Sequence, residues 1–76
     1  MEPQAVKQLL ESALPGCDIT VDGDGRHFNI RIVGDIFAGK RPVQRQQLVY
    51  GILNEKIAEG AIHAVNMTTL TPDEQT

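Results

Sequence analysis

Cysteine is almost absent from this chain: of its 76 residues, only Cys17 carries a thiol. An intramolecular disulfide is therefore excluded, and a zinc site built from paired cysteines of this chain alone is excluded with it. A domain of this size then depends on well-formed helices and a sheet around a small core. A single thiol, with no secretory signal recognisable at the start, predicts a protein of a reducing compartment such as the cytoplasm.

Long apolar runs, tryptophan and an excess of positive charge are also missing. No segment approaches the roughly 20 apolar residues that a membrane-spanning helix requires. Seven Lys and Arg stand against ten Asp and Glu, a formal net charge of -3, which argues against a general polyanion binder. With two Phe and one Tyr, the chain also lacks interleaved aromatic residues for stacking nucleic-acid bases.

What is present is a clear hydrophobic pattern in the order α-β-β-α-β. Apolar residues at helical spacing predict one helix over residues 3–14 and a second over 42–58. Two alternating segments joined by the "DGDG" turn at 22–25 predict a β-hairpin between these helices. A short β-branched run at 61–70 predicts a third strand.

These elements predict an α+β fold in which both helices pack on one face of a three-stranded sheet. Residues 1–76 form a single domain in this interpretation, because no linker, repeat or low-complexity segment divides the chain. The polar residues 71–76 are expected to form a loosely ordered tail.

Motifs for catalysis are not found in the sequence. Neither Ser12 nor Cys17 stands in a recognisable arrangement with a histidine or an acid. The glycine-rich turn lacks the length of a phosphate-binding loop, and its Asp22 and Asp24 lack the spacing of an EF-hand. We therefore expect a protein that is not an enzyme, and we expect the turn to be structural.

The two histidines, His27 and His63, are the candidate metal ligands. Taken alone, each histidine more readily fits a solvated or hydrogen-bonded ring that has no further role. Strand alternation does not decide where His63 points, because apolar residues occupy both faces of its strand. Two histidines are too few to hold a metal tightly, so a ligand role would require a site shared with a partner.

Positive charge is concentrated at Lys40, Arg41 and Arg45, which lie within six residues of one another. One interpretation is a solvated basic face at the start of the second helix. The other is a docking surface for an acidic protein patch or for a nucleic-acid backbone.

Four motifs in the predicted order resemble those of the BolA-like proteins, and most closely those of their short bacterial branch. They are "GDGRHF" at 23–28, "FAGK" at 37–40, "RQQLVYGIL" at 45–53 and "IHAV" at 62–65. Each motif is weak alone, but together they are specific, and the resemblance covers nearly the whole chain in the same order. The resemblance implies an α-β-β-α-β fold similar to a class II KH module.

The resemblance also implies an adaptor that pairs with a monothiol glutaredoxin and shares a bridging 2Fe–2S cluster with it. The glutaredoxin and glutathione would supply thiolates, and His63 matches the family's histidine ligand. Many relatives carry a second ligand in the loop of the hairpin, where this chain has Asp24, with His27 nearby. A carboxylate is a hard and unusual ligand for such a cluster. The isolated chain is expected to hold no cofactor.

The alternative implied by the family is a KH-like transcriptional regulator that binds nucleic acid through Lys40, Arg41 and Arg45. A KH module clamps backbone phosphates with a GXXG loop, and this chain has no such motif. A weak homodimer through the exposed face that would bind a partner is also compatible with the sequence. No association with a membrane is expected.

Overall fold

The computed structural model describes residues 1–75 of the chain. The prediction of a loosely ordered tail lies, for Thr76, outside the described residues. In chain order, the elements are α1 (Pro3–Ala13), β1 (Asp18–Gly23), β2 (His27–Val33), the 3-10 turn η1 (Asp35–Phe37), α2 (Pro42–Ala58), β3 (Ala64–Leu70) and the 3-10 turn η2 (Pro72–Gln75). The predicted order α-β-β-α-β is confirmed.

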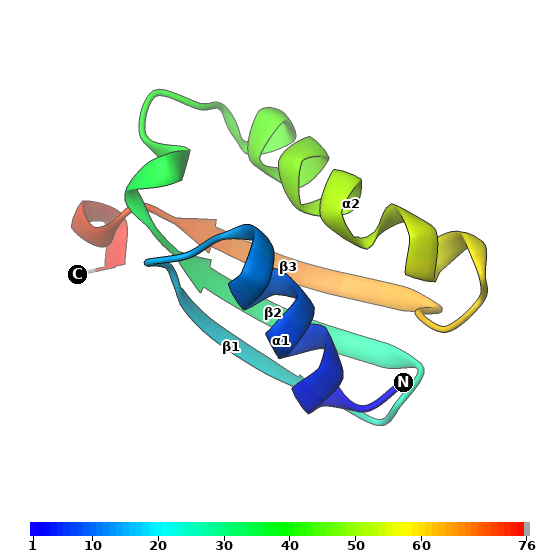
Figure 1. Ribbon diagram of the computed structural model, residues 1–76. Coiled ribbons are helices and arrows are strands. Elements are labelled where there is room, and N and C mark those ends of the chain that lie inside the picture. The colour runs from blue at the N-terminus through cyan, green and yellow to red at the C-terminus, as the bar shows by residue number, and fades with distance from the viewer. Residues whose placement is uncertain (76) are drawn as a thin grey trace.

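The three strands form one sheet in the order β1-β2-β3. β1 and β2 are an antiparallel hairpin, and β3 runs parallel to β2, with His27 opposite Ala64. A parallel neighbour requires a crossover, which α2 provides with the usual right-handed sense (Figure 1). Both helices lie on the same face of the sheet (Figure 1), so the predicted α+β layering is confirmed.

The core lies between the helices and the inward face of the sheet. Strand alternation sends Phe28, Ile30 and Ile32 of β2 into it, as the hairpin pattern predicts. The helices contribute their apolar stripes, and η1 adds one aromatic ring. The side chains that are fully or almost fully buried are Val6, Leu10, Leu14, Ile19, Phe28, Ile30, Ile32, Val33, Phe37, Val49, Leu53 and Ile62.

The end of the chain is more ordered than the sequence predicts. Residues Pro72–Gln75 form a 3-10 turn in which the backbone N–H of Thr71 donates to the Glu74 carboxylate at 2.8 Å. The same carboxylate accepts hydrogen bonds from Arg45 of α2. A polar tail is thus attached to the domain by a partner that is distant in sequence. None of the helices within residues 1–75 is long and apolar enough to cross a membrane.

Candidate metal-donor site and the basic residues

The turn between β1 and β2 is organised by Asp24. Its Oδ1 accepts the backbone N–H groups of Arg26 at 3.0 Å and His27 at 2.9 Å. Gly25 supplies the left-handed backbone, with φ +97°, that this tight turn requires. The hydrogen bonds from the His27 and Arg26 backbone lower the pKa of Asp24 to about 2. Asp24 is therefore an ionised carboxylate whose Oδ1 is already occupied by the turn.

His27 and His63 are brought together at this end of the sheet. Their ring centroids lie 6.1 Å apart, with an interplanar angle of 74°. His27 Nδ1 lies 3.5 Å from Asp24 Oδ2, a contact that favours a proton on Nδ1 and leaves Nε2 free. The His63 backbone N–H donates to the carbonyl of Arg26 at 2.9 Å, which ties the approach to β3 to the turn. Two imidazoles from distant parts of the chain thus share one exposed corner.

The position of His63 differs from the prediction. β3 begins at Ala64, three residues later than the predicted start at residue 61, so His63 precedes the strand rather than lying inside it. Its side chain is exposed, which excludes a packed core histidine. Strand alternation could not place this residue because the residue belongs to the connection between α2 and β3.

Within residues 1–75, no group of three or more His, Cys, Asp or Glu side chains could hold a metal ion. The remaining thiol, Cys17, lies beside Gly34 at the opposite end of β1 from the turn. Burial, together with the charge of Asp35, raises the pKa of this thiol. The two imidazoles of the histidine corner are therefore too few to hold a metal ion alone, and a metal bound there would need ligands from outside the described chain.

Arg45 does not contribute to an exposed basic surface. Its guanidinium donates from Nε to the carbonyl of Lys40 at 2.9 Å and from Nη1 to the carbonyl of Thr69 at 3.0 Å. It also donates from Nη1 and Nη2 to the two carboxylate oxygens of Glu74, at 2.6 Å and 3.3 Å. The residue is only 9% exposed and lies 5.8 Å from the Phe37 ring centroid.

The prediction that Arg45 is exposed beside Lys40 and Arg41 is therefore wrong. A charged side chain at this helix position is tolerated in the interior because its donors meet carbonyl oxygens and a carboxylate. Arg41 is exposed and Lys40 half-buried, so two of the three predicted cations are left for a surface. That reduces the charge available for a nucleic-acid backbone.

The Glu74–Arg45 contact makes stability depend on pH. The hydrogen bonds from Arg45 and from the Thr71 backbone lower the pKa of Glu74 from 4.5 to about 2. A lowered folded-state pKa stabilises the fold above the unfolded value, and this stabilisation is lost as pH falls from about 4.5 towards 2. We expect urea midpoints to fall over this window, and Glu74→Gln to flatten that fall. Glu11→Gln, on the exposed side of α1, should leave the profile unchanged; an identical effect from both variants would contradict the assignment.

The comparison with known families decides the relationship of this chain. A family described as BolA-like protein matches residues 2–74. The chain belongs to the BolA-like family. It is similar to the acid stress protein IbaG of Escherichia coli K12, with 43% identity over 74 residues that cover 97% of this chain and 88% of the relative.

Solved structures agree with this membership. A bolA protein homologue from Coxiella burnetii superimposes with a TM-score of 0.84 at 32% identity, covering 99% of this chain and 96% of the other. Yeast Fra2 superimposes with a TM-score of 0.81 at 31% identity, covering 100% of this chain and 85% of the other. The predicted resemblance and the predicted fold are both confirmed.

In this BolA-like protein, the two predicted sites lie at opposite ends of an elongated molecule of 33 × 19 × 19 Å. The histidine corner is at the β1–β2 turn, where α2 ends and β3 begins (Figure 1). Lys40 and Arg41 precede α2 at the other end of the helix, beside the C-terminal turn.

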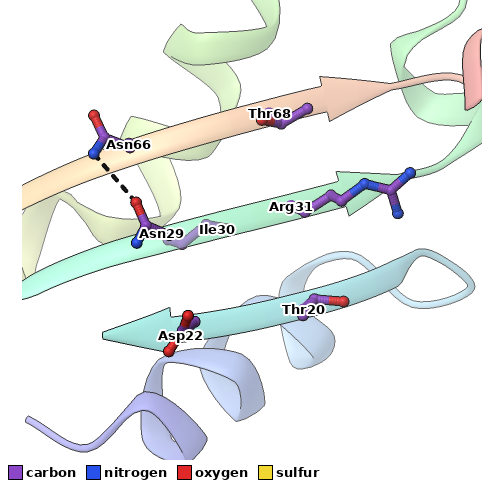
Figure 2. A pocket seen from close by; sticks show the side chains of 7 residues that line it. All are labelled: Thr20, Asp22, Asn29, Ile30, Arg31, Asn66 and Thr68. Atoms are coloured by element: carbon purple, nitrogen blue, oxygen red, sulfur yellow. Dashed lines mark hydrogen bonds between the residues drawn. The ribbon is translucent and has the colours of Figure 1, made fainter. Parts of the chain in front are cut away.

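The face of the sheet away from the helices is polar and carries a shallow groove of about 200 Å³. At one end of this groove the side-chain amide of Asn66 donates to Asn29 Oδ1 at 3.2 Å, across β2 and β3 (Figure 2). The residues lining the groove are Thr20, Asp22, Asn29, Ile30, Arg31, Asn66 and Thr68. This face is therefore a solvated surface rather than a second apolar layer.

Proposed function

We propose that this protein is a non-enzymatic adaptor that binds a monothiol glutaredoxin and shares a 2Fe–2S cluster with it. Membership of the BolA-like family makes this role the expected one. The observation that carries the proposal is the exposed corner at which His63 and His27 lie with their rings 6.1 Å apart.

The donor set fits one side of such a cluster. Two imidazoles bind a single iron in Rieske-type 2Fe–2S centres, while thiolates bind the other iron. A glutaredoxin cysteine and glutathione would supply the thiolates here, and this chain has no exposed thiol to compete with them. We infer that His63 is the principal ligand and that His27 is the second.

Asp24 is better suited to orienting the site than to binding iron. Its Oδ1 holds the turn, and its Oδ2 faces His27 Nδ1, so the carboxylate supports the imidazole as an outer hydrogen-bond partner. A neutral imidazole is also the softer ligand for iron in a sulfide-bridged cluster. In this chain, His27 would thus take over the role that the ligand in the hairpin loop has in many relatives.

The proposal is tested by anaerobic cluster reconstitution with a monothiol glutaredoxin and glutathione. We expect this protein to change the visible absorption and circular dichroism of the glutaredoxin cluster. His63→Ala should abolish that change, and His27→Ala should weaken it, because each removes an imidazole donor. Far-UV circular dichroism would confirm that both variants remain folded.

Two controls separate ligation from general damage. Asp24→Asn keeps an oxygen acceptor for the turn but removes the carboxylate beside His27, so it should weaken the spectral change no more than His27→Ala does. Replacing both Lys40 and Arg41 with alanine, at the far end of the molecule, should retain the full spectral change. If the glutaredoxin spectrum is the same with and without wild-type protein, the proposed function is wrong.

A further inference from the structure

β3 is an outer strand of the sheet, and its free edge has a definite pattern. Ala64 donates its N–H, and Leu70 accepts through its carbonyl, in hydrogen bonds with backbone groups at the two ends of β2. The backbone N–H and carbonyl groups of successive residues point to opposite edges of a strand. In β3, those of the even-numbered residues therefore point towards β2. The N–H and carbonyl groups of Val65, Met67 and Thr69 therefore point away from the sheet.

One end of this edge is already occupied. The Thr69 carbonyl accepts the Arg45 guanidinium at 3.0 Å, and the C-terminal turn with Glu74 lies beside it. The N–H of His63, at the other end, is used by the carbonyl of Arg26. The part of β3 whose outward-pointing backbone N–H and carbonyl groups remain available for pairing is therefore short. It runs from Val65 to Met67 and is centred on Asn66.

An apolar stripe of α2 lies alongside this edge. Leu48 and Ile52 pack against the core, whereas Val43 and Tyr50 are 58% and 42% exposed. In a right-handed β2–α2–β3 crossover, the flank carrying Leu48 and Ile52 faces α1. The flank carrying Val43 and Tyr50, seven residues apart on one stripe, faces outwards over β3. The free edge of β3 and this flank of α2 therefore lie on the same side of the molecule, the side remote from α1 (Figure 1).

Charge distinguishes the two edges of the sheet. β3 has the sequence AVNMTTL and carries no charged side chain. β1, the other outer strand, carries Asp18 and Asp22. Pairing two copies through β1 would place like charges close together, whereas pairing through β3 opposes none. Natural edge strands are usually protected by charge, proline or a bulge, and β3 has none of these between Val65 and Met67.

We propose that two copies of this chain associate through antiparallel pairing of their β3 strands, with Asn66 opposite Asn66 of the second copy. In this register Val65 of each copy exchanges both backbone hydrogen bonds with Met67 of the other. The occupied Thr69 carbonyl stays outside the pairing. The half-buried Val65 and Met67 side chains meet beneath the two α2 helices, whose exposed stripes then flank the two-fold axis.

The association is expected to be weak and reversible. Only a short segment of each strand is available, and interfaces below about 1,200 Å² are typical of transient complexes. This inference does not depend on cluster binding, because the histidine corner takes no part in the pairing. His63→Ala should therefore leave the association unchanged. The proposed cluster binding and the proposed strand pairing can thus be disproved independently of each other.

Sedimentation analysis from micromolar to millimolar protein tests the pairing. The mass should rise from 8.3 kDa towards twice that value. Met67→Pro removes an outward N–H without breaking the β2 ladder and should weaken the association at least about tenfold. Val21→Pro makes the matching change on the free edge of β1 and should have no effect on it. A chain that stays monomeric throughout, or an association that Met67→Pro leaves intact, would overturn the proposal.

Cysteine crosslinking tests the register in a Cys17→Ala background. Directly opposed residues of a non-hydrogen-bonded pair lie about 4.5 Å apart between Cα atoms, within the range of a disulfide. Asn66→Cys should therefore form a crosslinked dimer on mild oxidation, whereas Thr68→Cys alone should not. Mixing Ala64→Cys with Thr68→Cys should give only the mixed dimer. Crosslinking of Asn66→Cys no faster than of Thr68→Cys would contradict this register.

Discussion

Replacing Phe37 with alanine should remove a large part of this protein's stability and shift its unfolding midpoint to a much lower urea concentration. The Phe37 side chain, in η1, is fully buried in the hydrophobic core, and its ring lies near Arg45 of α2. Removing a buried phenylalanine ring costs about 3–5 kcal/mol, because transfer free energy is lost and a cavity remains. A domain of this length has a total stability of only about 4–11 kcal/mol.

The measurement is urea denaturation followed by far-UV circular dichroism. Phe37→Leu should fall between the wild type and Phe37→Ala, because it leaves a smaller cavity. Tyr50→Ala, which truncates an exposed aromatic ring, should change the unfolding free energy by less than about 0.5 kcal/mol. Equal losses for Phe37→Ala and Tyr50→Ala would show that η1 is not part of the cooperative core.

Arg45→Met should be the second most damaging substitution. Methionine keeps most of the aliphatic stem but leaves the carbonyls of Lys40 and Thr69 without their donors and Glu74 without its cation. Unsatisfied buried acceptors cost about 1–3 kcal/mol each, so we expect a loss of about 2–4 kcal/mol after allowing for the solvent near Glu74.

The matched controls change one group at a time. Arg45→Lys keeps the charge but not the planar set of donors, and it should recover only part of the loss. Arg41→Met removes an exposed cation four residues earlier and should be nearly neutral. If Arg45→Met and Arg41→Met have the same unfolding free energy, Arg45 is a surface residue in solution and the assigned contacts are wrong.

The helices and the hairpin were predictable because their signals are local. Pro42 begins α2 at the predicted residue, and the apolar alternation of β2 places Phe28 and Ile30 in the core. The positions of Arg45 and His63 depend on contacts made between distant parts of the chain. No local sequence pattern predicts these contacts.

Arg45 illustrates the limit most clearly. It stands four and eight residues before Val49 and Leu53, so helical spacing alone places it on the buried face. Its charge argues for the surface, and the partner that settles the conflict, Glu74, follows 29 residues later in a tail that looks unstructured. An arginine that helical spacing places on the buried face of a helix therefore indicates that a carboxylate from a distant part of the chain lies nearby.

The candidate site was predictable as a set of residues but not as an arrangement. His27, His63 and Asp24 were all identified, yet only the parallel pairing of His27 with Ala64 brings the two histidines together. The resemblance to the family points to Asp24 as a ligand position, whereas its hydrogen bonds to the turn follow from its place before Gly25.

The parallel pairing of β2 with β3 has a consequence for the order of folding. The hairpin and the helices form from contacts close in sequence, but the third strand joins residues that are 37 positions apart, such as His27 and Ala64. A growing chain that has not yet extended beyond residue 63 lacks one third of its sheet and cannot close the layer beneath α2. We therefore expect cooperative folding to wait until β3 has been synthesised, and chains that lack β3 to be the form most open to proteolysis.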